Sequence, residues 1–200
     1  MPEIHAWPST LVLVALAAYA LGSVPFGIVW ARAFGLGDLR RIGSGNIGAT
    51  NVLRTGNKPA AFLTLVCDAG KGAFAVLLAR ALIGEDAAQV AALAAFLGHC
   101  FPVWLQFHGG KGVATFLGTL LALSFPLGLA TCAAWLAVAA AARISSLAAI
   151  LAAVASPLLA LWLRPDSVLL CAALAAMILY RHGPNIRRLR AGEEPRIGRK

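Results

Sequence analysis

Long stretches with few or no charged residues alternate along this chain with short segments that are basic, polar and rich in glycine. The apolar stretches cover residues 4–31, 59–79, 87–110, 112–142, 144–163 and 167–180. A helix needs about 20 apolar residues to cross the hydrocarbon core of a bilayer, so this pattern predicts membrane-spanning helices. Residues 112–142 are too long for one ordinary span, and Phe125-Pro126-Leu127-Gly128 interrupts them where a helix would lose a hydrogen bond. They predict either one tilted helix or two short ones.

The positions of the basic residues decide between these alternatives. Lys and Arg gather on the cytoplasmic side of membrane proteins, and each added span moves the basic C-terminal tail to the other side. With seven spans and the N-terminus outside, every Lys and Arg except Lys71, Arg80 and Arg164 lies on the cytoplasmic side. We therefore predict an all-α, polytopic helical membrane bundle of about seven transmembrane helices, with its N-terminus outside and its C-terminus cytoplasmic. We expect the first span to be retained rather than cleaved as a signal peptide.

The composition excludes a water-soluble protein, because 60% of the residues are hydrophobic and only 12% are charged. Seven spans leave no room for a separate soluble domain, so residues 1–200 are expected to form a single membrane domain. The net charge of +9 would suggest nucleic acid in a soluble protein, but here it reports orientation, and no nucleic-acid partner is expected. The four cysteines lie far apart within apolar stretches, and no Cys/His cluster has ligand spacing, so neither a metal nor a cofactor is expected.

Residues 43–51 form a polar segment between the first two apolar stretches. Glycines allow backbone N–H groups to converge on an anion, while hydroxyls and amides add neutral donors and arginine adds charge. The candidate phosphate-binding residues here are Ser44, Gly45, Asn46, Gly48, Thr50, Asn51 and Arg54. The spacing of Gly43, Gly45 and Gly48 also fits a dinucleotide-binding fingerprint, but that motif needs a parallel sheet, which this composition does not supply. The alternative is a flexible polar loop.

A second polar segment, residues 108–115, joins the third and fourth apolar stretches. It is not a Walker A loop, because Lys111 is followed by Gly112 rather than Ser or Thr. Its glycines still permit close backbone approach, and Lys111 offers a mobile charge for a phosphate. Gly110, Gly112 and Thr115 are further candidates for phosphate contact, and an ordinary inside-positive turn is the alternative.

Asp68, Lys71 and His99 are ionisable residues within apolar stretches and need partners there. Asp68 and Lys71 are three residues apart, so on a helix they share a face and can neutralise each other. Whether they contact substrate or only pair stays open at this point. His99 precedes Pro102, which would end or bend its helix, and could be a hydrogen-bonded core histidine, a general base or a substrate positioner.

The tail that follows the last apolar stretch is basic, which by itself would serve as a stop-transfer signal that attracts anionic lipid. His182 and Asn185 are not needed for that purpose and are candidate phosphate ligands. Arg143 and Ser146 add a cation and a hydroxyl to the same predicted side. The sequence thus predicts several polar segments that face the cytoplasm together.

Together these segments resemble the bacterial acyl-phosphate-dependent glycerol-3-phosphate acyltransferase family. The resemblance rests on residues 22–27, 43–51, 68–72, 98–102, 107–115 and 181–194. It implies transfer of a fatty acyl group from acyl phosphate to the 1-hydroxyl of glycerol 3-phosphate, releasing phosphate and lysophosphatidate. It also implies a multi-pass protein of the bacterial cytoplasmic membrane whose active site faces the cytoplasm. Membrane lipid would surround it, and a soluble partner enzyme could supply the donor.

The resemblance suggests roles for the candidate residues. Ser44, Lys111 and His99 are expected to be catalytic, with Asp68 and Lys71 supporting them. Ser44, Asn46, Thr50 and the glycine backbone would hold one phosphate, and Arg54, Lys111, His182 and Asn185 the other. The hydroxyl proton would go to His99 or to a substrate phosphate oxygen. Two alternatives remain from the residues: a small anion transporter or channel, and an acyltransferase that uses acyl-CoA.

Overall fold

The computed structural model describes residues 2–198, and it is helical throughout, with no β-strand among them. This agrees with the all-α prediction. The helices, including three short 3₁₀ turns labelled η, are α1 (Pro8–Gly22), α2 (Phe26–Ala33), η1 (Leu39–Arg41), α3 (Ala49–Leu53), α4 (Lys58–Leu82), α5 (Glu85–Cys100), η2 (Val103–Leu105), α6 (Val113–Leu123), α7 (Phe125–Ala142), α8 (Ser145–Leu163), η3 (Pro165–Ser167), α9 (Val168–Arg181) and α10 (Gly183–Ala191).

Five helical segments of the described chain are long and apolar enough to cross a membrane: Pro8–Ala33, Lys58–Leu82, Glu85–Leu105, Phe125–Ala142 and Ser145–Leu163. The pair formed by Pro165–Arg181 and Gly183–Arg190, bent by 64°, is a sixth candidate. Seven spans and the orientation of the two termini therefore stay predictions. Arg199 and Lys200, which that orientation places in the cytoplasm, lie outside the described residues.

The long apolar stretch 112–142 forms two helices, which confirms the second of the two alternatives. α6 ends at Leu123 and α7 begins at Phe125, with Ser124 extended between them and Pro126 in the first turn of α7. Proline is tolerated there because the first N–H groups of a helix have no intrahelical acceptor. α6 has 11 residues, so it is only about 16 Å long and falls short of the ~30 Å hydrocarbon core.

The first apolar stretch is also broken, which the sequence pattern did not predict. α1 ends at Gly22 and α2 begins at Phe26, because Pro25 lacks an N–H and disfavours the helical conformation at Val24. The break frees backbone carbonyls from helical bonding. The Ser23 carbonyl accepts a hydrogen bond from Trp104 Nε1 at 2.9 Å, and the Val24 carbonyl accepts one from Lys71 Nζ at 2.7 Å.

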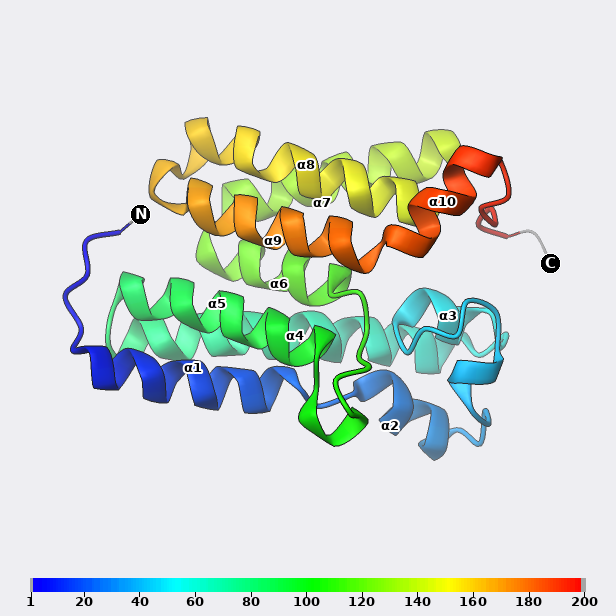
Figure 1. The fold of residues 1–200 in the computed structure, drawn as a ribbon, viewed down its shortest axis with the longest axis horizontal. Coiled ribbons are helices and arrows are strands. Elements are labelled where there is room, and N and C mark those ends of the chain that lie inside the picture. Colours follow the sequence, from blue (N-terminus) through cyan, green and yellow to red (C-terminus); the bar gives the residue numbers. More distant parts are fainter. Residues whose placement is uncertain (1, 199–200) are drawn as a thin grey trace. The chain divides into compact units, whose positions relative to one another are not determined.

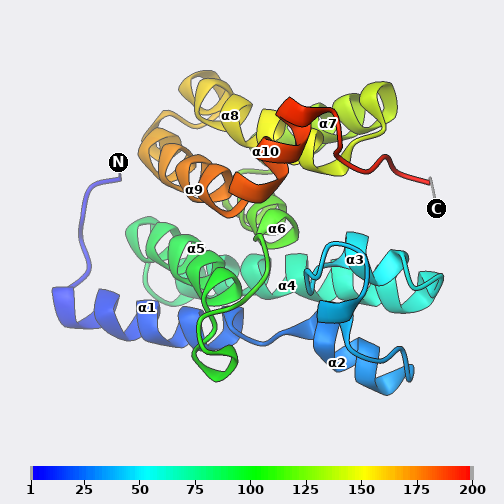
Figure 2. The same ribbon diagram turned by 45° about the vertical axis from the view of Figure 1, so that its right-hand side comes forward.

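The chain divides into two compact units, an N-terminal unit of residues 4–123 and a C-terminal unit of residues 124–198 with residues 2–3. The expectation of a single domain over residues 1–200 stays a prediction. Figures 1 and 2 show α1, α4 and α5 side by side within the N-terminal unit, where α6 also packs on α4 and α5. In the C-terminal unit, α8 packs against both α7 and α9.

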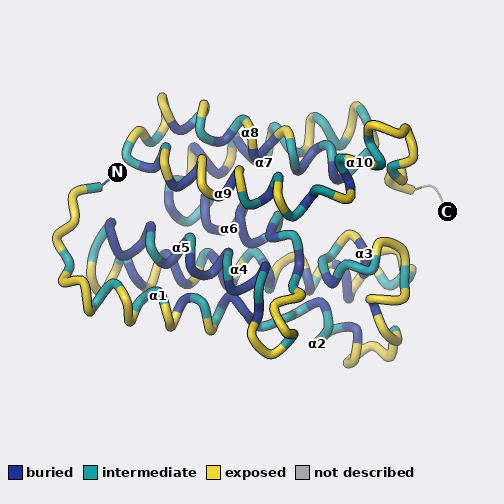
Figure 3. The backbone as a smooth tube through the Cα atoms, in the orientation of Figure 1, coloured by how far each residue is buried: buried dark blue, intermediate teal, exposed yellow. Residues whose placement is uncertain are grey.

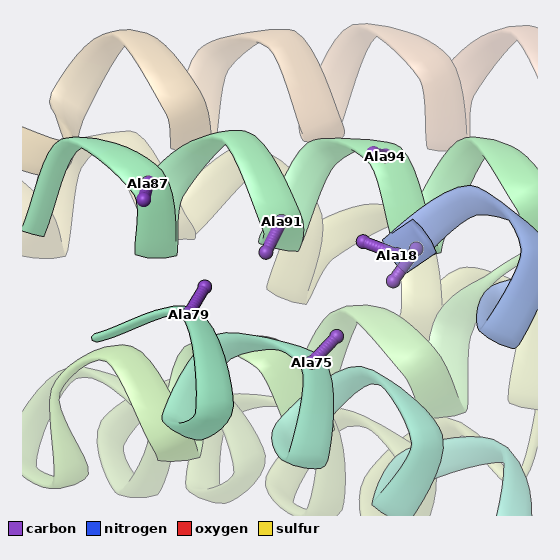
Figure 4. Close-up of a cluster of buried hydrophobic side chains, with 7 residues drawn as sticks. Ala18, Ala75, Ala79, Ala87, Ala91 and Ala94 are labelled. Carbon is purple, nitrogen blue, oxygen red and sulfur yellow. The ribbon is translucent and has the colours of Figure 1, made fainter. Parts of the chain in front are cut away.

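Small residues let the helices of the N-terminal unit approach closely. A cluster of buried alanines joins α1, α4 and α5, and in Figure 4 Ala75 and Ala79 of α4 point toward α5. A Cβ atom at Gly22 would overlap the backbone of Ala95, and one at Gly98 would overlap the backbone of Tyr19. Helices in membranes pack through such small residues, since lipid supplies no hydrophobic driving force between them. As a result α5 is buried along most of its length, whereas α1 is exposed on its outer side (Figure 3).

The three basic residues that the predicted topology does not place in the cytoplasm, Lys71, Arg80 and Arg164, all have partners in the structure. The guanidinium of Arg80 donates to the carbonyls of Ala122 and Leu123, both at 2.7 Å, and pairs with Glu85 at 2.8 Å. Arg80 thus satisfies carbonyls that the end of α6 leaves without intrahelical donors. Arg164 pairs with Asp166 at 2.8 Å, and Lys71 with Asp68 at 2.8 Å. These side chains therefore have structural roles, and their positions do not depend on how the protein is oriented in the membrane.

Candidate functional site

The polar segment 43–51 runs through a loop into the first turn of α3, and the buried side chain of Asn51 connects the two. Asn51 is 2% exposed. Its Oδ1 accepts the backbone N–H of Ser44 at 3.0 Å and lies 3.3 Å from the Ser44 hydroxyl oxygen, while its Nδ2 donates to the Leu39 carbonyl at 2.9 Å. Arg54 Nη1 lies 3.5 Å from the same Oδ1. These side-chain hydrogen bonds define the path of the chain, which favours a binding role over the alternative of a flexible loop.

Glycine is required at two positions of this loop by its backbone. Gly43 and Gly45 have φ values of +53° and +69°, which lie in the left-handed region that side chains disfavour. A Cβ at Gly43 would also lie 2.6 Å from Asn51 Oδ1 and 2.7 Å from Arg54 Cδ. Ser44 and Thr50 are exposed, and Asn46 uses its Oδ1 to accept the N–H of Ile47 at 3.0 Å. The loop therefore presents two hydroxyls at the surface on a rigid base.

The segment that carries Lys111 is held by the end of α5. Gly109 N–H donates to the Cys100 carbonyl at 3.2 Å, and Gly110 N–H donates to the His99 carbonyl at 3.0 Å. Gly112 has a φ of +82°, and a Cβ there would overlap the ring of Phe96. Lys111 is half-buried, and Thr115 donates its hydroxyl to the Asp68 carbonyl at 2.9 Å. We call residues 109–112 the Lys111 loop.

The two polar segments of the N-terminal unit meet. Arg40 Nη2 donates to the carbonyl of His108 at 3.3 Å, and a Cβ at Gly45 would lie 3.1 Å from the Arg40 carbonyl. The Arg40 side chain therefore reaches His108, the residue just before the Lys111 loop. Its backbone carbonyl lies next to Gly45 of the segment 43–51. Next to it lies a hollow of about 790 Å³, lined mainly by α2, by the chain around η1 and by η2, and including Arg32, Arg40 and Trp104.

Asp68, Lys71 and His99 form one buried cluster. Lys71 Nζ lies 2.8 Å from Asp68 Oδ1, 2.9 Å from His99 Nδ1 and 2.7 Å from the Val24 carbonyl oxygen. The side chains are 1%, 3% and 4% exposed for Lys71, Asp68 and His99 respectively. The predicted pairing of Asp68 with Lys71 is confirmed, and His99, separated by 28 residues from Lys71, joins the pair.

In the C-terminal unit the candidate residues gather around a carboxylate. Glu194 Oε1 accepts the Ser146 hydroxyl at 2.7 Å and an Asn185 amide N–H at 2.6 Å, while its Oε2 accepts Arg188 Nε at 2.7 Å. Burial raises the pKa of Glu194, but the hydrogen bonds from Ser146, Asn185 and Arg188 outweigh it and hold the pKa below its ordinary value. The single O–H of Ser146 is therefore directed at Glu194.

His182 lies beside this group on the same chain segment and is also buried. Its Nδ1 donates to the Ile178 carbonyl at 2.8 Å, so in the neutral ring Nε2 carries the lone pair. His182 and Asn185 are 2% and 3% exposed. Both are thus held in defined orientations, as a binding residue requires.

The structure brings the predicted residues together within each unit: Ser44 with Asn51 and Arg54, His99 with Asp68 and Lys71, and Ser146 with Asn185. Sequence reasoning missed Glu194 as the residue that organises the last group. The signal was an acid placed within a basic tail, inside the range 181–194 that carries the family resemblance. It also missed Val24, whose backbone carbonyl accepts a hydrogen bond from Lys71. Any residue type has such a carbonyl, so the side chain gives no signal.

Comparison with known proteins identifies the family. The glycerol-3-phosphate acyltransferase family model matches residues 12–192. Glycerol-3-phosphate acyltransferases of Jannaschia sp. (strain CCS1) and Ruegeria sp. (strain TM1040) are each 68% identical to this chain, over 100% of it and 98% and 100% of their own lengths.

Solved structures agree with this assignment. The crystal structure of PlsY (YgiH), an integral membrane glycerol 3-phosphate acyltransferase, in its glycerol 3-phosphate form superposes with a TM-score of 0.88 at 38% identity, covering 94% of this chain and 96% of that one. Its lysophosphatidic acid form gives a TM-score of 0.85 at 36% identity over the same shares of both chains. The resemblance predicted from the motifs is confirmed: the chain belongs to the glycerol-3-phosphate acyltransferase family.

Proposed function

We propose that this protein transfers a fatty acyl group from acyl phosphate to the 1-hydroxyl of glycerol 3-phosphate, giving lysophosphatidate and phosphate in the first acylation step of phospholipid synthesis. The match to PlsY in its glycerol 3-phosphate form, over 94% of the chain, carries this proposal. The second form, with lysophosphatidic acid, names the corresponding product for that relative. Family membership over residues 12–192 supports the same activity.

The chemistry of the donor fits a site built for binding and alignment. Acyl phosphate is an activated mixed anhydride, so the hydroxyl oxygen can attack the carbonyl carbon directly. A C–O bond forms to glycerol 3-phosphate, the C–O bond to the donor phosphate breaks, and phosphate leaves with the bonding electrons. The enzyme mainly has to align the two substrates and stabilise the oxyanion that develops on the carbonyl oxygen. No covalent nucleophile is needed.

Cations and glycine-rich backbone are the protein's means for this alignment. In the proposed mechanism Ser44, Asn46, Thr50 and the neighbouring glycine N–H groups bind one phosphate. Arg54 and Lys111 bind the other, and His182 and Asn185 stay candidate phosphate ligands of the C-terminal unit. The hydrogen bond from Arg40 to the His108 carbonyl supports the joint action of the first two segments, because Arg40 closely precedes the first of them and His108 begins the second.

The hydroxyl proton has two candidate acceptors, His99 and a phosphate oxygen of the substrate. His99 is 5% exposed, and its Nδ1 is already engaged inside the protein, 2.9 Å from Lys71 Nζ and 3.5 Å from Asp68 Oδ1. This setting supports transfer of the hydroxyl proton to a phosphate oxygen of one of the substrates.

The fatty chain of the donor also needs an apolar recess. The hollow of about 790 Å³ combines apolar walls from Ile28, Ala31 and Leu105 with the cations Arg32 and Arg40. Since Asp38 also lines it and none of the proposed phosphate ligands does, we assign to it only part of the fatty chain and not the donor phosphate.

The proposed location is the bacterial cytoplasmic membrane, with the active site facing the cytoplasm. The placement of Lys and Arg supports this orientation. Single cysteines introduced at Thr55 and Ala191 of a variant without native cysteines should react with a membrane-impermeant maleimide only after the cells are opened. Labelling in intact cells would reverse the proposed orientation.

A direct assay tests the proposed reaction. The purified protein is incubated with glycerol 3-phosphate and either palmitoyl phosphate or palmitoyl-CoA, and lysophosphatidate is measured. Product from acyl phosphate alone is expected, whereas product from acyl-CoA alone would identify a different donor. Uptake of labelled glycerol 3-phosphate by proteoliposomes without any acylated product would favour the transporter alternative.

A further inference from the structure

Lys71 joins parts of the chain that are far apart in sequence. The ammonium group of a lysine has three N–H bonds, and three acceptors surround Nζ: Asp68 Oδ1 from the same helix, His99 Nδ1 from α5, and the Val24 carbonyl at the break between α1 and α2. The face of the Phe26 ring lies beneath it, with Nζ 5.7 Å from the ring centroid. Each donor of Lys71 therefore has an acceptor, and the lysine links α4, α5 and the α1–α2 break.

Stability alone does not account for such a cluster. Removing two charges from water costs free energy that their attraction often fails to recover, and replacement of a buried pair by apolar residues is commonly neutral or stabilising. Elsewhere in this unit α1, α4 and α5 approach one another through alanines and glycines. The cluster therefore calls for an explanation in terms of what it positions.

The group that it positions is the Lys111 loop. The backbone of His99 accepts the N–H of Gly110 at 3.0 Å, and the next carbonyl, that of Cys100, accepts the N–H of Gly109 at 3.2 Å. The imidazole ring itself forms the seat of the loop, because a Cβ at Gly110 would overlap Nε2 and lie 2.9 Å from Cε1 and 3.0 Å from Cδ2. Any rotation or shift of this ring would displace Gly110, which directly precedes Lys111.

Lys71 determines how that ring is oriented. Because an ammonium group can only donate, His99 Nδ1 must accept, and the proton of the neutral ring is then on Nε2. The two ring nitrogens are thereby distinguished, and the ring is fixed against a flip.

We propose that Asp68, Lys71 and His99 are positioning residues that hold the Lys111 loop in place for acyl transfer; the proposal rests on the function proposed above. Asp68 holds Lys71, Lys71 orients His99, and the ring and backbone of His99 support Gly109 and Gly110. His99 on this view transfers no proton. A displaced lysine loses alignment with the substrate phosphate, and a shift of about 1 Å can cost about a hundredfold in rate.

Four variants separate positioning from mere stability and from proton transfer. Lys71→Met removes the ammonium and leaves the buried Asp68 carboxylate facing His99, whose Nδ1 lies 3.5 Å from Oδ1. Asp68→Asn combined with Lys71→Met removes both charges, so that folding is retained while the link to His99 is lost. His99→Gln keeps an acceptor and a donor, and His99→Ala removes both. Lys58→Met, at an exposed lysine of the same helix, is the matched control.

Each variant is measured for kcat, for KM of glycerol 3-phosphate, for melting temperature in detergent and for the rate of trypsin cleavage after Lys111. The double variant should melt near the wild-type temperature, lose about a hundredfold in kcat and be cleaved faster after Lys111. His99→Gln should keep kcat within about tenfold of wild type and a protected loop, whereas His99→Ala should resemble the double variant. Lys58→Met should behave as wild type.

Two results would overturn the proposal. One is a double variant with wild-type kcat and wild-type cleavage, since the cluster would then position nothing. The other is a His99→Gln variant as inactive as His99→Ala although its loop stays protected, since His99 would then act on the proton. A wild-type protein without acyltransferase activity would refute the proposed function instead, and the cleavage rates would still test the support of the loop.

Discussion

Asn51 Oδ1 accepts the backbone N–H of Ser44 at 3.0 Å, and it lies 3.3 Å from the Ser44 hydroxyl oxygen. One buried amide thus fixes both the chain and the side chain of the residue predicted to be catalytic. The other end of the same amide donates to the Leu39 carbonyl at 2.9 Å. Replacing Asn51 should consequently disturb the path of the loop, whereas replacing Ser44 should remove only the exposed hydroxyl.

Ser44→Ala removes the hydroxyl and leaves the backbone bond to Asn51 in place. We expect kcat/KM for glycerol 3-phosphate to fall about 100-fold, the size seen when one polar contact to a transition state is lost. The melting temperature should stay within about one degree of wild type, because an exposed hydroxyl contributes little to stability. Wild-type turnover in this variant would remove Ser44 from the site.

Asn51→Ala should lower both activity and stability. It deprives the Ser44 N–H and the buried Leu39 carbonyl of their partners, and each unsatisfied buried group costs about 1–3 kcal/mol. The melting temperature, followed by tryptophan fluorescence, should therefore drop by several degrees. Loss of activity without any change in melting temperature would contradict the structural role assigned to Asn51.

Lys111→Ala tests the second polar segment. The loop is held by backbone hydrogen bonds from Gly109 and Gly110, so the variant should fold and melt as wild type does. Turnover should fall by about 100- to 1,000-fold or more, because a cation directed at a phosphate or a developing oxyanion is lost. Lys58→Ala serves as the control and should retain full activity. Comparable rates in the two variants would exclude Lys111 from the site.

Glu194→Gln tests the carboxylate that organises the C-terminal cluster. A charge-assisted hydrogen bond contributes about 1.5–3 kcal/mol, and Glu194 is only 6% exposed, so the variant should melt several degrees lower at neutral pH. Its kcat should fall as well, because the neutral amide accepts from Asn185 more weakly and turns an NH2 group toward Arg188. Glu193→Gln, at the exposed neighbouring acid, is the control and should leave both quantities unchanged.

The pH dependence of that difference has a definite sign. The pKa of Glu194 in the folded protein lies below its ordinary value of 4.5. A depressed pKa means that the carboxylate contributes its stability above pH 4.5 and loses it as the pH falls through the folded value. The gap in melting temperature between wild type and Glu194→Gln should thus be constant near neutrality and shrink below about pH 4.5. A gap that does not change with pH would contradict this origin.

Arg80→Ala tests the junction between α4 and α6. The variant removes the donor to the carbonyls of Ala122 and Leu123 and the ion pair between Arg80 and Glu85. A loss of about 2–3 kcal/mol is expected, measured as a fall in melting temperature with KM unchanged. Arg41→Ala is the control: its ion pair with Asp38 is 3.7 Å long, its side chain is 88% exposed, and such surface pairs contribute about 0–1 kcal/mol. Equal effects of the two substitutions would refute the role of Arg80.

Several features of this protein could be predicted from local sequence. The period and length of the apolar stretches predict helices whatever their neighbours are, and proline chemistry placed the end of α5 before Pro102 and the break before α7. The spacing of Asp68 and Lys71 predicts their contact, because residues three apart on a helix share a face. Motif order and spacing identified the family, since glycines at positive φ and phosphate-directed donors are residue-specific requirements.

Other features depended on contacts between distant segments. The helix break at Pro25 supplies a free carbonyl to Lys71, the contact of His99 with Lys71 spans 28 residues, and Glu194 collects donors from 48, 9 and 6 residues away. Residue types and their spacing do not predict which backbone carbonyl a helix break leaves free. They also do not predict which side chain donates a hydrogen bond to it. The sequence by itself determined which residues are helical, apolar, basic or able to bind phosphate. Only the tertiary structure decided which buried polar atoms satisfy one another, because that pairing is set by packing geometry across the whole unit.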